Sequence, residues 1–176
     1  MRMLSVEKFR VGERVIWIGV IFSGRVQGIS FAFDRGTLMR RICALAEHLE
    51  KRGVSISLDV QPSEYPEKVF KVLTGELDNV DFLPELSFEG VTPFEKKVYE
   101  WLTKNVKRGS VITYGSLAKV LNTSPRAIGG AMRRNPYPIV VPCHRVVAHD
   151  GIGYYSSGID EKKFLLEIEG VKRWTS

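Results

Sequence analysis

The sequence contains only two cysteines among its 176 residues, Cys43 and Cys143, and it has no C-x-x-C pair. Two cysteines cannot build a disulfide framework, and the spacing of a structural zinc site is missing. Because disulfide-poor chains are typical of reducing compartments, the composition predicts a cytoplasmic, intracellular protein. We expect no metal and no cofactor.

Long apolar runs are missing too, which excludes a membrane-spanning helix, and the charged residues that follow Met1 to Leu4 exclude a signal peptide. No membrane association is therefore expected. Glutamine occurs twice and asparagine four times while Lys and Glu are abundant, a bias that favours a thermophilic source. Hydrophobic content of 44% and charged content of 26% are typical of an ordinary globular protein of one domain or two small ones.

Acidic residues are absent between Trp101 and His149, although the net charge of the whole chain is only +6. A solvated basic face is the ordinary explanation of such a run. Eight positive charges without one acid nevertheless favour a polyanion, such as nucleic acid, as the partner. These basic residues are Lys104, Lys107, Arg108, Lys119, Arg126, Arg133, Arg134 and Arg145.

Residues 1–75 predict a small N-terminal α/β domain. Two strand-like runs, 14–22 and 26–33, are joined by Ser23-Gly24-Arg25 and predict an antiparallel hairpin. Residues 35–52 have apolar residues at helical spacing, 54–60 resemble a third strand, and a short helix follows Pro66. Cys43 falls among the apolar positions of the first helix, so we expect it in the core. Residues 76–91, rich in acids, Pro and Gly, are predicted to be a linker.

Residues 92–176 predict a mostly helical C-terminal domain, so the fold class is α+β. Thr92 and Glu95 form a capping box with Pro93 at the first helical position. A second short helix is expected over 116–121, and a third from Pro125 to about residue 135, with Ser124 as its N-cap. Two short helices across a tight turn, the second of them basic, indicate a helix-turn-helix. A last helix is expected over 160–169.

The pentapeptide Pro142-Cys143-His144-Arg145-Val146 follows the apolar run 139–141. That run is short and β-branched, so it predicts a buried strand that ends at Pro142. A lone cysteine is more often a small buried apolar residue than a nucleophile. Here, however, the neighbouring imidazole and guanidinium could supply the base and the positive field that make a thiolate.

This pentapeptide resembles the active-site signature of the O6-alkylguanine-DNA alkyltransferases, which move an alkyl group from damaged guanine to their own cysteine. Three more motifs occur in the family's order. Residues 126–136 read Arg-x-x-Gly-Gly-x-Met-x-x-Asn-Pro and resemble the recognition helix with its following asparagine. Tyr155-Ser156-Ser157-Gly158 resembles the loop that closes over the base, and Glu169 matches a family glutamate. The resemblance covers motifs over 92–170 and only the architecture over 1–75.

The resemblance implies a role for each matching residue. Cys143 would be the nucleophile and His144 the base, Glu169 would orient His144, and Tyr114 would serve the leaving group. By itself, Glu169 reads as a solvated charge at a helix end, and His149 is a competing base. The implied DNA-binding residues are Tyr114, Gly115, Thr123, Ser124, Arg126, Arg133 and Asn135. The implied base pocket consists of Met132, Val146, Tyr155, Ser156 and Ser157.

Small residues in the predicted recognition helix, such as Gly129 and Gly130, have two explanations. They allow the helix to pack closely on a neighbour, or they let its backbone approach DNA while Arg126 reaches outward. In the family this helix enters the minor groove, and the matching arginine fills the base stack where the flipped nucleotide was.

The resemblance therefore implies DNA repair by direct reversal of damage. A monomer would transfer the alkyl group of O6-alkylguanine in double-stranded DNA to Cys143, once and irreversibly, with O4-alkylthymine as a further candidate substrate. The alternative is a non-catalytic helix-turn-helix protein that binds DNA or lesions, although the relatives of that kind lack the nucleophile. A multi-turnover cysteine hydrolase is a third class, but it would not explain the motifs around Arg126.

Overall fold

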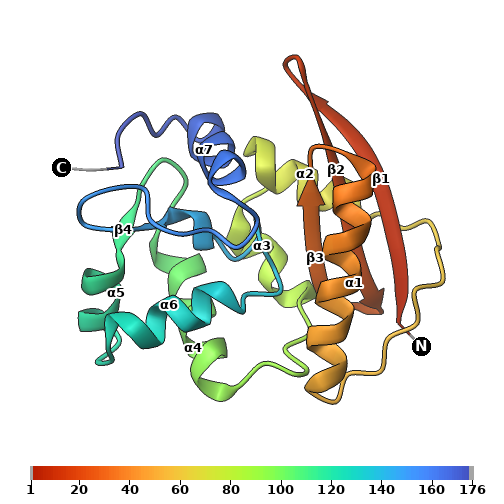
Figure 1. Ribbon diagram of the computed structural model, residues 1–176, viewed down its shortest axis with the longest axis horizontal. Coiled ribbons are helices and arrows are strands. Elements are labelled where there is room, and N and C mark those ends of the chain that lie inside the picture. Colours follow the sequence, from red (N-terminus) through yellow and green to blue (C-terminus); the bar gives the residue numbers. More distant parts are fainter. Residues whose placement is uncertain (1, 175–176) are drawn as a thin grey trace.

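The computed structural model describes residues 2–174 and has a three-stranded antiparallel sheet on one side and a helical part on the other (Figure 1). Within the described residues, no helix is both long enough and apolar enough to cross a membrane. The strands are β1 (Met3–Val11), β2 (Arg14–Ser23), β3 (Arg25–Ala32), β4 (Ile112–Thr113) and β5 (Val146–Val147). The helices are α1 (Arg35–Lys51), α2 (Tyr65–Thr74), α3 (Asn79–Phe82), η1 (Leu83–Glu85), α4 (Pro93–Asn105), α5 (Tyr114–Val120), α6 (Pro125–Arg133), η2 (Cys143–Arg145) and α7 (Ile159–Ile168).

The predicted hairpin is present as β2 and β3. Ser23 pairs with Arg25 around Gly24, whose φ of +71° suits a tight turn. The sequence pattern does not predict β1, because charged residues interrupt its alternation, yet β1 pairs with β2 over its whole length. The fold is thus α+β, as expected.

Helix α1 packs on one face of this sheet and α2 on the other (Figure 1). Gly19 and Gly28 allow the close approach, since a Cβ atom on either would lie 2.8 Å from a side chain of α1. The expectation that Cys43 lies in the core is wrong. Its neighbour Ile42 is fully buried, and one residue of helical rotation turns Cys43 to the exposed side.

The strand expected over residues 54–60 is also wrong. Only Val60 makes a bridge, parallel to Leu4, and the rest of the segment is irregular. Backbone hydrogen bonds hold it beside β1, from the Leu4 N–H to the Asp59 oxygen (2.9 Å), from the Gln61 N–H to the Leu4 oxygen (2.8 Å) and, just before β1, from the Ser57 N–H to the Arg2 oxygen (3.2 Å). The segment covers an edge that would otherwise be open to pairing with other chains.

The connection between the two halves, residues 76–91, contains α3 and η1. Asn79, Phe82 and Leu86 are buried there, and the Ser87 N–H donates to the Val26 oxygen (2.7 Å) at the edge of β3. Farther along this edge, the Ile29 N–H donates to the oxygen of Pro136, so the C-terminal half is also attached to the sheet.

The C-terminal half begins with the predicted capping box. The Thr92 hydroxyl accepts from the Glu95 N–H and the Glu95 carboxylate accepts from the Thr92 N–H, both at 3.1 Å. The predicted helix-turn-helix is formed by α5 and α6, with α5 starting at Tyr114, two residues earlier than expected. Ser124 caps α6, its hydroxyl accepting from the Ala127 N–H (3.1 Å).

Candidate active site

The nucleophile candidate lies after a strained turn rather than after a strand. Residues 139–141 form a turn, so the predicted strand is wrong; Ile139 has a φ of +74°, which β-branched residues rarely adopt. At Pro142 (φ −79°, ψ 62°) the chain makes an inverse γ-turn, in which the Cys143 N–H donates to the Val141 oxygen (2.7 Å). The prolines before and after this run remove the N–H groups that a strand ladder needs.

A short parallel pair of strands brings Tyr114 to this motif. Ile112 pairs with Val146 and Thr113 pairs with Val147, so α5 begins beside the segment that follows Cys143. The Tyr114 hydroxyl donates to the backbone oxygen of Tyr154 (3.3 Å). Burial, together with the nearby Cys143, raises the pKa of Tyr114, which keeps its proton available for donation.

His144 and Glu169 form a buried pair. His144 Nε2 lies 2.9 Å from Glu169 Oε2, and both side chains are excluded from solvent. The view of Glu169 as a solvated charge is therefore wrong, because α7 ends with this carboxylate turned inward. Burial would raise its pKa, but His144 and Arg145 hold that pKa far below its ordinary value. Burial lowers the pKa of His144, with Glu169 opposing the effect, so the imidazole is neutral at pH 7.

The tautomer of His144 follows from this contact. A carboxylate can only accept, so Nε2 carries the proton and Nδ1 keeps its lone pair. Nδ1 is buried and has no hydrogen-bond partner among the described residues. His144 thus offers a neutral, desolvated acceptor for a proton. The competing base, His149, is exposed.

Arg145 is a buried structural cation. Its Nε and Nη2 atoms donate to the two oxygens of Glu169 at 2.9 and 2.8 Å, and its Nη1 atom donates to the Val106 oxygen (2.8 Å). Two further residues of the basic run are also engaged internally. Arg134 pairs with Glu95 (2.7 Å), and Arg108 donates to the Leu73 oxygen at the end of α2 (2.9 Å). The expectation of eight unopposed charges is wrong for Arg134 and Arg145, whose acidic partners lie outside the run.

Cys143 as a whole residue is 5% exposed, and burial raises the pKa of its thiol. The Asn135 amide, the positive charge of Lys162 and the Tyr155 hydroxyl act in the opposite direction. The thiol therefore needs a base to become a thiolate at neutral pH.

Sequence reasoning missed Lys162. Its ammonium donates to the backbone oxygens of Val146 (2.7 Å) and Tyr154 (3.0 Å), and its side chain is fully buried. Burial lowers its pKa to about 8, and Cys143 opposes this shift. One signal could have revealed it, because Lys162 precedes Leu165 and Leu166 by three and four residues and so lies on the apolar face of α7.

The structure divides the other predicted residues into two groups. Met132, Val146 and Tyr155 are buried, and Asn135 ties the end of α6 to the motif, since its amide donates to the Val141 oxygen (3.1 Å) and accepts from the Tyr137 N–H (3.0 Å). The second group lies at or near the surface and consists of Gly115, Thr123, Ser124, Arg126, Arg133, Ser156 and Ser157.

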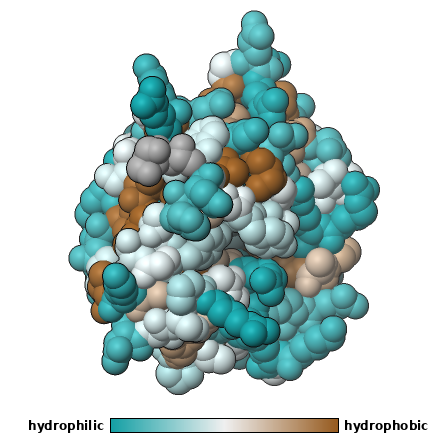
Figure 2. Space-filling model, turned by 60° about the vertical axis from the view of Figure 1, so that its left-hand side comes forward, coloured by the Kyte–Doolittle hydropathy of each residue, from teal (hydrophilic) through white to brown (hydrophobic). Residues whose placement is uncertain are grey.

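Gly129 and Gly130 of α6 differ in their surroundings. A Cβ atom on Gly130 would meet the Arg134 guanidinium at 3.0 Å, whereas a Cβ atom on Gly129 would have nothing within 4 Å. Packing therefore does not explain Gly129. The side of the molecule that carries α5 is largely hydrophilic, with small hydrophobic patches (Figure 2). Such a face is compatible with a polar partner.

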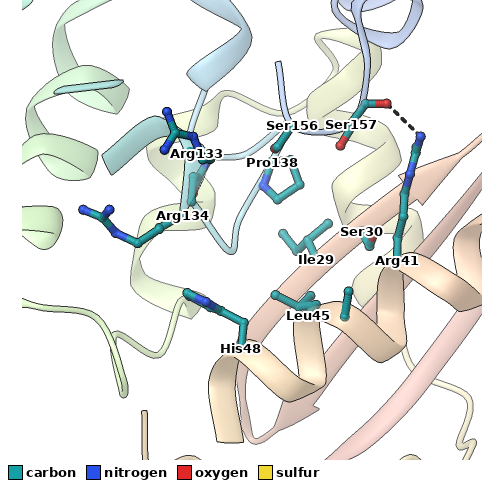
Figure 3. Close-up of a pocket in the computed structure, with 12 residues that line it drawn as sticks. Ile29, Ser30, Arg41, Leu45, His48, Arg133, Arg134, Pro138, Ser156 and Ser157 are labelled. Carbon is teal, nitrogen blue, oxygen red and sulfur yellow. Dashed lines mark hydrogen bonds between the residues drawn. The ribbon is translucent and has the colours of Figure 1, made fainter. Parts of the chain in front are cut away.

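A cavity of about 270 Å³ lies between α1 and the C-terminal half (Figure 3). From α1, Arg41 reaches across and donates to the Ser157 oxygen (2.7 Å) and to Glu161 (2.5 Å). Asn135, which adjoins the thiol, also lines the cavity. No cluster of His, Cys, Asp or Glu suited to a metal ion occurs in residues 2–174. The remaining lining residues are Ile29, Ser30, Ala44, Leu45, His48, Arg133, Arg134, Pro138 and Ser156.

Fold and site together define an α+β protein with a helix-turn-helix and a buried cysteine backed by a His–Glu pair. Residues 3–87 match the family described as methylated DNA-protein cysteine methyltransferase, N-terminal. Residues 93–171 match the one described as 6-O-methylguanine DNA methyltransferase, DNA binding domain. The chain therefore belongs to the methylated-DNA–protein-cysteine methyltransferase family, a family of DNA-repair methyltransferases.

Individual relatives agree with this assignment. The methylated-DNA–protein-cysteine methyltransferase of Thermococcus kodakarensis is 90% identical over 174 residues, which are 99% of this chain and all of the relative. The crystal structure of O6-methylguanine-DNA methyltransferase from the hyperthermophilic archaeon Pyrococcus kodakaraensis is likewise 90% identical. It superposes with a TM-score of 0.96 over 96% of this chain and all of that one. The structure of Mycobacterium tuberculosis OGT in complex with DNA shares the fold, with a TM-score of 0.69 and 24% identity over 95% of this chain and 92% of that one.

Proposed function

We propose that this protein repairs O6-alkylguanine in double-stranded DNA by moving the alkyl group to Cys143, once per molecule and irreversibly. The observation that carries the proposal is the buried Cys143 thiol directly before His144, whose neutral imidazole is held by Glu169 at 2.9 Å. The family membership and the exposed basic helix-turn-helix support DNA as the partner.

The reaction is a displacement at the alkyl carbon. His144 Nδ1 takes the thiol proton, through a bridging water in the Glu–His–water–Cys relay of the family, and Glu169 stabilises the resulting imidazolium. The Cys143 sulfur then forms a bond to the alkyl carbon as the carbon–O6 bond breaks, and the electron pair of that bond goes to the guanine. Tyr114 donates a hydrogen bond or a proton to the leaving purine. No metal or cofactor is needed.

Two features of the chemistry shape the rest of the proposal. A paired guanine hides O6 inside the duplex, so the nucleotide must flip out before Cys143 can reach it. The product is a thioether, which a second thiol cannot cleave as it would a disulfide. The other cysteine, Cys43, lies on the exposed face of α1. Each molecule therefore repairs one lesion.

DNA would lie along α6 through its minor groove. The open space beside Gly129 would let the DNA backbone approach α6. The exposed Arg126 would fill the gap that the flipped nucleotide leaves in the base stack. The rest of the proposed contact surface consists of Tyr114, Gly115, Thr123, Ser124, Arg133 and Asn135. The proposed base pocket consists of Met132, Val146, Tyr155, Ser156 and Ser157.

We assign DNA binding and transfer to residues 92–176, with 1–75 as a supporting domain and 76–91 as the connection. The protein acts as a monomer inside the cell. O4-alkylthymine is a second candidate substrate.

Incubation with duplex O6-methylguanine DNA tests this proposal. We expect one added methyl group per protein, located on Cys143 by peptide mass spectrometry. Cys143→Ala should bind DNA and lose all transfer, whereas the matched variant Cys43→Ser should react like the unmodified protein. A methyl group on Cys43, or continued turnover, would contradict the mechanism. Binding without any transfer would point to the lesion-binding alternative.

A further inference from the structure

The connecting segment contains a buried polar residue that the mechanism has not used. Asn79, the first residue of α3, is 6% exposed and lies 64 positions before the nucleophile. A buried amide must have partners for both its donor and its acceptor groups, because an unpartnered one is destabilising. All the partners of Asn79 belong to the segment around Cys143.

The amide of Asn79 spans the nucleophile. On one side of Cys143, its Nδ2 atom donates to the backbone oxygens of Ile139 and Val140, both at 2.9 Å. On the other side, its Oδ1 atom accepts from Arg145 Nη2 at 3.2 Å. One amide therefore contacts the backbone before the reactive cysteine and the side chain of a residue after it.

The first contact holds a strained backbone. Ile139 has a φ of +74°, and such a conformation of a β-branched residue persists only where its surroundings enforce it. The carbonyl groups of this turn have no strand partner, and the Asn79 donor binds two of them. Without this donor the turn would be free to relax. Cys143, which follows Val140 by three residues and Ile139 by four, would move with it.

The second contact leads to the base. Arg145 donates to both oxygens of Glu169 at 2.8 and 2.9 Å, and Glu169 in turn lies 2.9 Å from His144. Asn79 thus stands at the far end of a continuous chain of buried polar contacts that leads to the imidazole.

We propose that Asn79 is a positioning residue for alkyl transfer. It holds the turn before Cys143 and the Arg145–Glu169 pair in the relative positions that the reaction requires. The inference rests on the function proposed above. Asn79 touches neither DNA nor the reacting atoms, so its loss should reduce the rate of the chemical step and leave DNA binding intact.

Single-turnover transfer by the full chain, at saturating O6-methylguanine DNA and well below the melting temperature, tests this. Asn79→Ala removes both contacts. Asn79→Asp keeps an oxygen toward Arg145 but places a second oxygen against the carbonyls of Ile139 and Val140. We expect both variants to react roughly tenfold to a hundredfold more slowly, as a misplacement of about 1 Å would cause. Their dissociation constants for DNA should stay within about twofold of the original.

Thr103→Val is the matched control. Thr103 is also buried and donates to the Tyr99 oxygen (2.7 Å) within α4, so its loss removes a buried hydrogen bond that involves neither the turn at 139–141 nor the Arg145–Glu169 pair. This control should lower the melting temperature and leave the transfer rate unchanged. Amide exchange at Val141 and Cys143 should accelerate in Asn79→Ala and not in Thr103→Val.

A normal rate in Asn79→Asp would overturn the proposal, as would an equal slowing in Thr103→Val or a loss of rate that only mirrors a loss of DNA affinity. If the unmodified protein transferred nothing, the proposed function would be refuted instead. The amide-exchange comparison would still decide whether Asn79 holds the turn.

Discussion

At the scale of single residues, the site combines a thiol that resists ionisation with a base that stays neutral. Burial raises the pKa of Cys143 and lowers the pKa of His144, so neither group carries a charge at rest. The thiolate–imidazolium pair that the proposed reaction requires would therefore form inside the protein, where Glu169 already balances Arg145 and lies beside His144. Arg126, by contrast, is exposed and lies at the start of α6, away from this buried network.

Arg126→Ala separates base flipping from chemistry. If the Arg126 side chain fills the stack left by the flipped nucleotide, its loss slows repair of duplex O6-methylguanine by about tenfold for each 1.4 kcal/mol lost. The same variant should react almost normally with free O6-benzylguanine, which has no stack to leave. Single-turnover rates on the two substrates measure this.

Tyr114→Phe provides the comparison, because a hydroxyl that serves the leaving group is needed for both substrates. It should slow both reactions. Equal losses on duplex and free base for Arg126→Ala would mean that the residue supports the pocket, and the intercalation idea would be wrong.

At the scale of elements, α6 contains a glycine that neither helix stability nor packing within the protein explains. Gly129 lies inside the helix with open space beside it, although glycine there is about 1 kcal/mol less favourable than alanine. Packing within the described residues therefore gives no reason for glycine at this position, and the proposed function supplies one, namely close approach of the α6 backbone to DNA.

Gly129→Ala should consequently stabilise the protein and weaken its DNA binding. We expect a gain of about 0.5–1 kcal/mol in the free energy of unfolding, and a loss of duplex affinity in a titration. Gly36→Ala, at an exposed glycine in the first turn of α1, is the control and should leave DNA affinity unchanged. Unchanged affinity in Gly129→Ala would show that α6 does not approach DNA at this point.

At the scale of the whole molecule, buried carboxylates join the two halves. Glu95 at the start of α4 accepts from Arg52 at the end of α1 (2.5 and 3.1 Å) and from Arg134 after α6 (2.7 Å). Burial would raise the pKa of Glu95, but these two arginines lower it from 4.5 to about 2. The folded state therefore binds the proton less tightly than the unfolded chain does.

This difference predicts acid sensitivity. The stabilisation from Glu95 is complete above about pH 4.5 and is lost as the pH falls toward 2, where the carboxylate becomes protonated in the folded state. Glu95→Gln should lower the free energy of unfolding by about 1–3 kcal/mol at neutral pH and should flatten the fall in melting temperature between pH 4.5 and 2. Thermal unfolding across this range is the measurement. An equally steep fall in the variant would assign the acid sensitivity to other carboxylates.

The positive charge of the C-terminal half is the second property of the whole molecule. Binding to undamaged duplex should weaken steeply with salt, because each neutralised phosphate releases counterions. Arg133→Gln should reduce the slope of log affinity against log salt by about one unit if this exposed arginine contacts a phosphate. Arg134→Gln is a useful comparison, since Arg134 is already paired with Glu95 and should change the slope less. If the affinity for DNA did not change with salt concentration, the basic residues would be better explained as an ordinary solvated surface.

What the sequence by itself determined is local. The capping box at Thr92, the N-cap at Ser124, the hairpin around Gly24 and the helix that begins at Arg35 were predicted correctly, because each depends on contacts within a few residues. The motif around Cys143 could be identified from the sequence for the same reason, since thiol, imidazole and guanidinium are neighbours in the chain.

What only the tertiary structure decided depends on distant partners. The run 139–141 has the composition of a strand, yet it forms a turn, and the carbonyl groups of Ile139 and Val140 accept from Asn79, some 60 positions earlier in the chain. By sequence alone, Arg145 is one of eight unopposed basic residues and Glu169 is a solvated charge at a helix end, but the fold pairs the two in a buried site. A local pattern records which side chains are apolar or charged. Whether a charge is solvated or paired depends on which segments fold against it, and this determines the chemistry of the site.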